Sequence, residues 1–392
     1  MKLNKEAILS VFGISVLMVA TSCSLQSERR TAAVADDPLN AAWQFAYAIT
    51  NDPADRAECQ DRVAQAYLAR GDYTTALKLG EQITDWHKGV VLAEVAASLA
   101  EIGKTSVAMT LVTQAEAIAR PIEDWQRDRI RVRAVKAKAL LGQEEDAGRI
   151  SQFYQGNQDY RAEVTAYHAL SLARAGQITN AFEVLTSQAG TTNLDLSGWR
   201  AKGYLLLANA GHLNAAQASN AFAQGWASSA PGWQNVQVQM SLVESVAACG
   251  DRAQARMWLD SVSSNVLTGP VPTHIRPQLL CQLGIQWSML GETQRVDECV
   301  QVAEPLIRKL QNIDQPVLFA LLGEACVRLG SEQRGLTYYG QALEMAGQLT
   351  NRRPRAMACV DICLSLERTR LRTKLLGERV NLLLLGFGAD HG

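Results

Sequence analysis

This chain of 392 residues contains few prolines and few aromatic residues. Its positive and negative charges nearly balance. Because proline interrupts helix interiors, a content of only ten leaves long segments free to form helices. The 38 basic and 39 acidic residues give a formal net charge of −1, so no overall basic field indicates a nucleic-acid partner. The body is rich in Ala, Leu and Gln, which favour helices. Composition therefore predicts a helical, near-neutral protein.

Catalytic and cofactor motifs are also missing. The chain contains no Gly-rich phosphate loop, no His-Glu-x-x-His, no Gly-x-Ser-x-Gly and no Cys-x-x-Cys. The five histidines stand apart from one another, without a Cys or carboxylate at ligand spacing: His87, His168, His212, His274 and His391. We therefore expect no enzyme activity, no cofactor and no metal site. An active site assembled from distant segments stays open as the alternative.

Residues 1–22 have the features of a secretory signal. Lys2 and Lys5 precede an apolar stretch, residues 7–20, which is shorter than the roughly 20 residues needed to cross a bilayer. The exit, Val-Ala-Thr-Ser before Cys23, resembles the lipobox of bacterial lipoproteins, with Ala20 where Leu is usual. This resemblance implies that Cys23 is lipidated and becomes the mature N-terminus. The alternatives are an ordinary signal with an incidental Cys23, or an uncleaved anchor.

The segment that follows predicts a tether. Residues 23–37 are polar and lack apolar periodicity, and a Cys that carries two or more acyl chains anchors stably. Ser24 after the Cys implies, by resemblance to bacterial sorting rules, an outer-membrane location facing the periplasm. Removing Lys2, Lys5 and Glu6 leaves 36 basic and 38 acidic residues, a net charge of −2. We expect a domain held at a membrane in the cell envelope rather than one that spans it.

Seven further cysteines are an odd number for an exported protein. Most fall in apolar-periodic helical segments, which favours buried thiols over a disulfide framework. Cys359 and Cys363 are four residues apart on one helix face, but no further ligands for a metal stand near them. The others are Cys59, Cys249, Cys281, Cys299 and Cys326.

A glycine recurs through the body at intervals of 32, 39, 34, 35, 39, 41 and 39 residues. The eight positions are Gly71, Gly103, Gly142, Gly176, Gly211, Gly250, Gly291 and Gly330. Apolar-periodic runs lie before and after each one. Five residues after it comes a small residue in seven cases: Ala76, Ala108, Ala147, Ala181, Ala216, Ala255 and Gly335. The seventh repeat has Val296 there instead.

This pattern predicts a helical hairpin in each repeat. The glycine can end the first helix in the left-handed conformation, and the small residue lets the second helix approach closely. One hairpin buries too little apolar surface to be stable alone, so stacked hairpins are expected. An aromatic residue also stands near the start of several first helices, and we expect it to pack between repeats rather than to stack on a ligand: Trp86, Trp125, Tyr160, Trp199 and Trp233.

The repeat resembles the tetratricopeptide family. The best match is residues 318–346, with Leu322-Gly323 in the first helix, Gly330 at the turn, Tyr338-Tyr339 in the second helix and Ala342 near its end. The closing Pro is absent from most repeats and many periods exceed 34. The predicted fold is an all-α solenoid of about eight such hairpins over residues 38–350, followed by a C-terminal helical cap over residues 351–392. The basic end of that cap is either solvated or in contact with anionic lipid.

By this resemblance, the first helices line a concave groove that holds a protein partner. The polar groove positions are Gln65, Lys136, Arg174, Asn209, Glu244, Glu324 and Arg328. They lack the clustered Lys and Arg that clamp a terminal carboxylate, so a helix or an extended, partly apolar segment is the expected ligand. We expect a membrane-tethered scaffold. The alternatives are a small-molecule binder or enzyme with a pocket between repeats, and a structural spacer.

Overall fold

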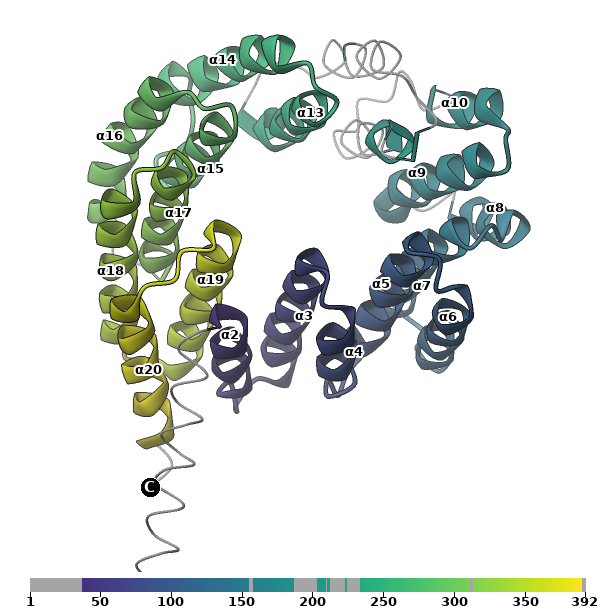
Figure 1. The fold of residues 1–392 in the computed structure, drawn as a ribbon, viewed down its shortest axis with the longest axis horizontal. Helices are drawn as coiled ribbons and strands as arrows, with labels where there is room; N and C mark the ends of the chain where they lie inside the picture. Colours follow the sequence, from purple (N-terminus) through teal and green to yellow (C-terminus); the bar gives the residue numbers. More distant parts are fainter. Residues whose placement is uncertain are drawn as a thin grey trace, which may run out of the picture.

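The computed structural model describes residues 37–154, 158–186, 203–208, 210–211, 223, 233–310 and 313–389. These residues form helices and turns, without strands, and the helices stack as successive hairpins along a curved array (Figure 1). This confirms the predicted all-α solenoid of tetratricopeptide-like hairpins. The signal segment, Cys23 and the polar tether lie outside the described residues. In the described part of the chain, no helix has both the length and the apolar character needed to cross a membrane.

Each hairpin whose two helices are described places its first helix on the inner side of the curve and its second on the outer side (Figure 1). The first helices are α3 (Pro53–Arg70), α5 (His87–Glu101), α7 (Trp125–Leu140), α9 (Gln158–Arg174), α13 (Val236–Ala248), α15 (Arg276–Met289), α17 (Gln315–Arg328) and α19 (Arg352–Thr369). The second helices are α4 (Tyr73–Gly80), α6 (Thr105–Ala119), α8 (Glu144–Tyr154), α10 (Ile178–Thr186), α14 (Arg252–Thr268), α16 (Thr293–Lys309), α18 (Glu332–Gln348) and α20 (Lys374–Ala389). Helix α2 (Pro38–Tyr47) precedes them, and a short 3-10 helix (Trp233–Asn235) precedes α13.

The recurring glycines form the turns, as predicted. All eight have φ between 74° and 93°, the left-handed region that glycine adopts without a steric penalty. In the first hairpin, Gly71 N donates to Leu68 O at 2.9 Å and the next residue's N donates to Tyr67 O at 2.9 Å, which closes α3 in a Schellman motif. Asp72 then caps α4 by accepting from Thr75 N at 3.0 Å. One short segment thus ends one helix and begins the next.

In the C-terminal hairpin a non-glycine residue takes this position. Arg370 follows α19 with φ of 55° and is the one non-glycine residue with positive φ in the described chain. A Cβ in this conformation costs about 1–2 kcal/mol. We therefore expect Arg370→Gly to stabilise the folded chain by about 1 kcal/mol, measured by urea unfolding. A loss of stability on this substitution would show that the Arg370 side chain contributes more than its backbone costs.

The small residues permit close packing within hairpins, as predicted. Ala76, Ala108, Ala147, Ala181 and Ala255 are fully buried, whereas Ala216 lies outside the described residues. In the hairpin of α17 and α18, a Cβ added at Gly335 would lie 3.1 Å from the Gly323 carbonyl oxygen. The two helices therefore approach until their backbones nearly touch.

The cysteines are free thiols, and six of the seven described ones are buried, as predicted. Burial raises the pKa of Cys59, Cys299 and Cys359 to about 12, so these thiols stay protonated at neutral pH. Cys249 is the partly exposed member. In the described chain, no group of three or more His, Cys, Asp or Glu could hold a metal ion, and Cys359 and Cys363 belong to no such group.

Alkylation tests this burial. The native chain carrying Cys23→Ser is expected to take up one acetamide group from iodoacetamide at pH 8, at Cys249, because the other thiols are inaccessible and protonated. In urea all seven should react. Intact-mass and peptide mapping measure the adducts, and rapid modification of Cys281 or Cys363 in the native state would contradict the packing.

The two ends of the array meet. Helix α2 packs against α19 and α3, so the N-terminal and C-terminal hairpins are neighbours although they lie at opposite ends of the sequence (Figure 1). We call the contact of α2 and α3 with α19 and α20 the seam. Its apolar centre contains Phe45, which is fully buried and meets the Phe387 ring edge-on at 5.6 Å between centroids. Arg352 joins the two halves by donating to Ala48 O at 3.1 Å and to Phe387 O at 3.0 Å.

Ion pairs flank this apolar centre. Arg70 of α3 contacts Asp37 at 2.7 Å and Glu367 of α19 at 2.6 Å. Arg62 pairs with Asp361, and Arg353 pairs with Asp52 and Asp55. Burial raises the pKa of Asp37, but the hydrogen bonds and charge of Arg70 outweigh it, and the resulting pKa is below 3.8.

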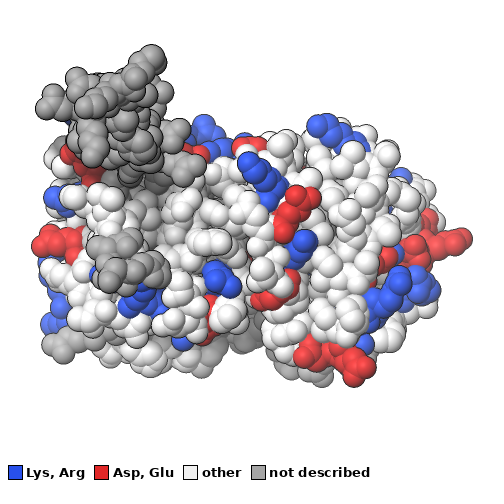
Figure 2. All heavy atoms as spheres, turned by 90° about the horizontal axis from the view of Figure 1, so that it is seen from below, with Lys and Arg blue, Asp and Glu red and all other residues white. Residues whose placement is uncertain are grey.

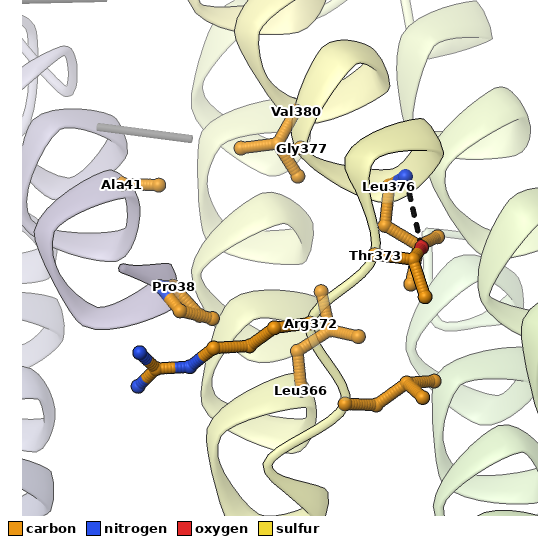
Figure 3. Close-up of a pocket in the computed structure, with 9 residues that line it drawn as sticks. Pro38, Ala41, Leu366, Arg372, Thr373, Leu376, Gly377 and Val380 are labelled. Atoms are coloured by element: carbon orange, nitrogen blue, oxygen red, sulfur yellow. Dashed lines mark hydrogen bonds between the residues drawn. The ribbon is translucent and has the colours of Figure 1, made fainter. Parts of the chain in front are cut away.

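The seam is closely filled. A cavity of about 20 Å³ lies between Pro38 and Ala41 of α2 and Leu371, Leu376 and Val380 of the C-terminal hairpin (Figure 3). Such a volume holds about one water molecule. Part of α20 faces outward: Leu383 and Leu384 pack on the core, but Leu382 and Leu385 are 68% and 58% exposed. The fold therefore covers only part of this run of four leucines.

Candidate functional site

A cavity of about 520 Å³ opens on the inner side of the N-terminal hairpins. It is formed by successive first helices, α3, α5 and α7, and most of its lining is charged or aromatic. The lining residues are Glu58, Asp61, Arg62, Gln65, Trp86, His87, Val90, Glu94, Trp125, Arg129 and Arg133. Because the described first helices face inward, this cavity lies on the inner side of the curve, the surface that the repeat pattern predicts for a partner (Figure 1).

Two tryptophans form one wall of the inner cavity. Trp86 stands at the start of α5 and contacts Trp125, at the start of α7, edge-to-face with centroids 5.1 Å apart. Trp86 also stacks on His87 at 3.8 Å, and His87 is fixed by Asp85, whose oxygens lie 3.0 Å from Nδ1. The packing of aromatic residues between repeats occurs here. Trp125 nevertheless stays 54% exposed, so it is also available to a ligand.

The floor of the cavity is a network of buried ion pairs. Arg133 Nη1 lies 2.8 Å from Glu163 Oε1 and 3.3 Å from Glu94 Oε1. Lys136 Nζ reaches Glu94 Oε2 at 3.0 Å, and Tyr167 Oη donates to Glu163 at 3.1 Å. Glu94 and Glu163 are 7% and 6% exposed, so these pairs hold α5, α7 and α9 in register.

One carboxylate in the cavity forms no ion pair with this network, although the charges of Glu94 and Arg133 act on it. Asp61 Oδ1 accepts a hydrogen bond from Gln65 Nε2 at 3.2 Å, and Asp61 forms no ion pair with any described Lys, Arg or His. Burial raises the pKa of Asp61 above 3.8, although the hydrogen bond from Gln65 acts in the opposite direction. Glu58, one turn earlier and exposed, likewise forms no ion pair in the described part of the chain. This side of the cavity is therefore acidic.

Two of the predicted groove residues belong to this site. Gln65 lines the cavity, and Lys136 pairs with Glu94 at its floor. Arg174, at the end of α9, and Glu244, on α13, are exposed and lie outside the cavity lining. Asn209 lies outside the described residues. A binding role for any of these positions stays a prediction.

The remaining two predicted residues form a separate cluster in the C-terminal half. Glu324 of α17 is 1% exposed and accepts from Arg328 Nη2 at 3.0 Å and from Arg368 Nη2 at 2.7 Å. Ser365 Oγ lies 2.9 Å from Glu324 Oε2 and 2.9 Å from Tyr339 Oη, which extends the network into the core. Because its oxygens are occupied by internal donors, Glu324 acts in this structure as a link between α17 and α19.

The chemistry available in the inner cavity is recognition by charge and aromatic contact. Its lining contains no Ser, Thr, Cys or Tyr that could act as a nucleophile. His87 is tied to Asp85, and the cavity carboxylates are either paired or, at Glu58 and Asp61, three residues apart on one helix. Such a constellation suits the binding of a charged group more directly than a covalent reaction.

The face of the molecule drawn in Figure 2 carries no broad field of one sign on its described residues. On the face in Figure 2, Lys and Arg side chains are interspersed with Asp and Glu. Local pairing, rather than overall charge, therefore decides where a charged ligand would bind.

No protein-family model matches the chain, and no curated protein matches its sequence. Among solved structures, the apo form of the quorum sensor NprR from B. thuringiensis is 11% identical, with a TM-score of 0.30 over 87% of this chain and 96% of that one. The APC/C hetero-tetramer Cut9-Hcn1 is 12% identical, with a TM-score of 0.28 over 85% and 77%. A circular tandem repeat protein with novel repeat topology is also 12% identical, with a TM-score of 0.20 over 94% and 86%. At these scores the comparisons do not indicate what this chain binds.

Proposed function

We propose that the chain is a membrane-tethered scaffold of the bacterial cell envelope that binds a protein segment along the inner side of its helical array. The observation that carries this proposal is the aromatic-walled, charged cavity on α3, α5 and α7. A rigid row of first helices presents this surface without itself needing to refold, which lowers the entropic cost of binding.

The composition of the cavity favours a polypeptide ligand. Side chains of both signs, two tryptophans and Val90 line one open surface, so a segment with mixed charge and some apolar character fits it. Helical grooves commonly bind amphipathic helices or extended segments in this way.

The tether is the second part of the proposal. Cys23 would carry the lipid, and the 14 residue steps to Asp37 would reach roughly 45–50 Å if fully extended. Asp37 lies at the seam through its contact with Arg70, so the tether would join the array beside α19. We place the domain at the outer membrane, facing the periplasm, on the basis of the signal segment and Ser24.

Photo-crosslinking in cells tests the binding surface. With p-benzoylphenylalanine at Trp125, in the cavity wall, we expect a discrete crosslinked protein that mass spectrometry can identify. The control position is Met257, which is 59% exposed on the outer helix α14. The same products from both positions, or none from Trp125, would contradict binding at the inner face.

Fractionation tests the tether independently. Cys23→Ser is expected to move the processed chain from the membrane fraction to the soluble fraction, because the acyl chains supply the membrane affinity. Unchanged processing and unchanged membrane association would refute the lipid anchor while leaving the inner-face binding site intact.

A small-molecule binder is the second candidate. The volume of about 520 Å³ is within the range of small-molecule sites, and it supports this alternative. A small-molecule binder should be saturated by a free small molecule alone, whereas the scaffold should bind a protein segment.

A further inference from the structure

We propose that the inner cavity is a recognition site for one cationic group, a lysine or arginine side chain of a bound segment or the ammonium of a small amine, held between Asp61 and the Trp86–Trp125 wall. This inference rests on the proposed function in taking the inner face as the binding surface, and it adds the chemistry that the site selects.

The first argument is the pairing of charges inside the cavity. Of its basic residues, Arg133 is committed to Glu94 and Glu163, and Arg62 is committed to Asp361 across the seam. Once these pairs are formed, the acidic groups left over are Glu58 and Asp61. Arg129 is the remaining basic group, and it is exposed. The carboxylates on the α3 side of the cavity therefore form no ion pair with a described side chain, although the charge of Arg133 acts on Asp61 without direct contact.

The second argument is the position of Asp61. Its carboxylate has lost part of its hydration to burial and receives one hydrogen bond, from the neutral amide of Gln65. A carboxylate can accept several hydrogen bonds, so acceptor capacity on Asp61 is left over. A cationic donor entering the cavity would supply both the missing hydrogen bonds and the missing charge, which is the partner that a partly buried carboxylate requires.

The third argument is the aromatic wall. Cations bind favourably over tryptophan faces, and the gain increases when the site is desolvated. His87 stacks on the Trp86 ring and so covers one of its faces. Trp125 is half exposed, and the planes of the Trp86 and Trp125 rings are 74° apart. The two indoles thus present differently oriented surfaces to a group in the cavity. An anionic ligand would instead meet two carboxylates that form no ion pair and the negative face of the Trp125 ring.

The test uses the full chain labelled with 5-fluorotryptophan and followed by ¹⁹F NMR. The eight tryptophans give internal reporters, and Trp86→Phe and Trp125→Phe assign the two resonances of the cavity wall. The probes are the peptides acetyl-Gly-Gly-X-Gly-Gly-amide with X as Lys, Arg, norleucine or Glu, and free spermidine. We expect Lys or Arg peptides, or spermidine, to shift the Trp86 and Trp125 resonances, and norleucine and Glu peptides to leave them unchanged.

Variants separate recognition from folding. Asp61→Asn keeps the shape of the side chain and should weaken cation binding about tenfold, since it removes a charge-assisted contact. Trp125→Ala, at an exposed position, should weaken it about threefold. The matched control is Asp260→Asn on the outer helix α14, which should bind like the unmodified chain. The spectrum without ligand reports whether each variant is folded.

The outcomes are distinct. Binding of spermidine without the peptides identifies a free amine as the source of the cation, and binding of the peptides without spermidine identifies a side chain. Equal binding of the norleucine peptide, unchanged affinity in Asp61→Asn, or the absence of shifts at Trp86 and Trp125 with every cationic probe would overturn the proposal. A partner crosslinked at Trp125 would still support the scaffold in that case, so failure here is distinguishable from failure of the proposed function.

Discussion

Replacing Glu324 with alanine is expected to destabilise the folded chain by about 2–3 kcal/mol. The side chain is 1% exposed and links α17 to α19 through Arg368 while also accepting from Arg328. Removing it leaves the guanidinium groups of two partly exposed side chains, Arg328 and Arg368, without their counter-charge. It also deprives Ser365 of an acceptor. The loss therefore includes uncompensated desolvation as well as the missing contacts.

Chemical unfolding in urea, followed by circular dichroism, measures this loss. Glu344→Ala is the matched control, because Glu344 is exposed on the adjacent helix α18 and should change stability by no more than about 0.5 kcal/mol. Equal effects of the two substitutions would show that the Glu324 network contributes nothing beyond an ordinary surface glutamate.

The same network gives stability a pH dependence. Burial raises the pKa of Glu324, but the hydrogen bonds from Arg368 and Ser365 and the nearby guanidinium charges outweigh burial, and the pKa is lowered from 4.5. The contribution of this depressed pKa is fully present above the unfolded-state value and is lost as pH falls through the folded-state value. Glu324→Gln, which cannot titrate, should flatten the acid limb of the stability profile below about pH 4.5. If the loss of stability at acid pH is the same in Glu324→Gln as in the unmodified chain, it arises from other carboxylates.

Replacing Phe45 with alanine is expected to cost about 3–5 kcal/mol and to loosen the seam specifically. Phe45 is fully buried between α2 and the C-terminal hairpin, with the Phe387 ring 5.6 Å away. Because stacked repeats are stabilised by their neighbours, loss of this contact should raise amide hydrogen exchange first in α2, α19 and α20.

Hydrogen exchange followed by mass spectrometry resolves where the loosening occurs. Phe153→Ala is the control, since Phe153 is 67% exposed on α8 and far from the seam in the fold (Figure 1). Faster exchange spread evenly over all hairpins, or confined to α8 and its neighbours, would contradict a local role of Phe45 in joining the ends.

The features that sequence predicted are those with a local cause. Gly71 and its seven counterparts stand at left-handed turns because glycine is the residue that such a conformation tolerates best. The buried alanine five residues later follows from the close approach of paired helices, as at Ala76. Arg370 adopts the same left-handed conformation although it is not glycine. The turn of the C-terminal hairpin therefore could not be predicted from a recurring glycine.

The seam and the cavity depend on contacts that no local pattern specifies. Arg352 and Ala48 are 304 positions apart, and nothing in either segment indicates that the other is its partner. The repeat register did bring Gln65 and Lys136 to the cavity. Asp61 was missed because an acidic residue on a first helix is ordinarily a solvated one. Its burial follows from the neighbouring hairpins, which only the assembled array reveals.

The meeting of the two ends is tested most directly by a distance measurement in solution. Spin labels would be placed on Tyr47, 59% exposed at the end of α2, and on Arg353, exposed at the start of α19, in a background without Cys23 and Cys249. The hydrogen bond from Arg352 to Ala48 O places these positions side by side. Pulsed electron paramagnetic resonance should then give one short, narrow distance distribution. A long or broad distribution would contradict the seam and describe an open array with separated ends.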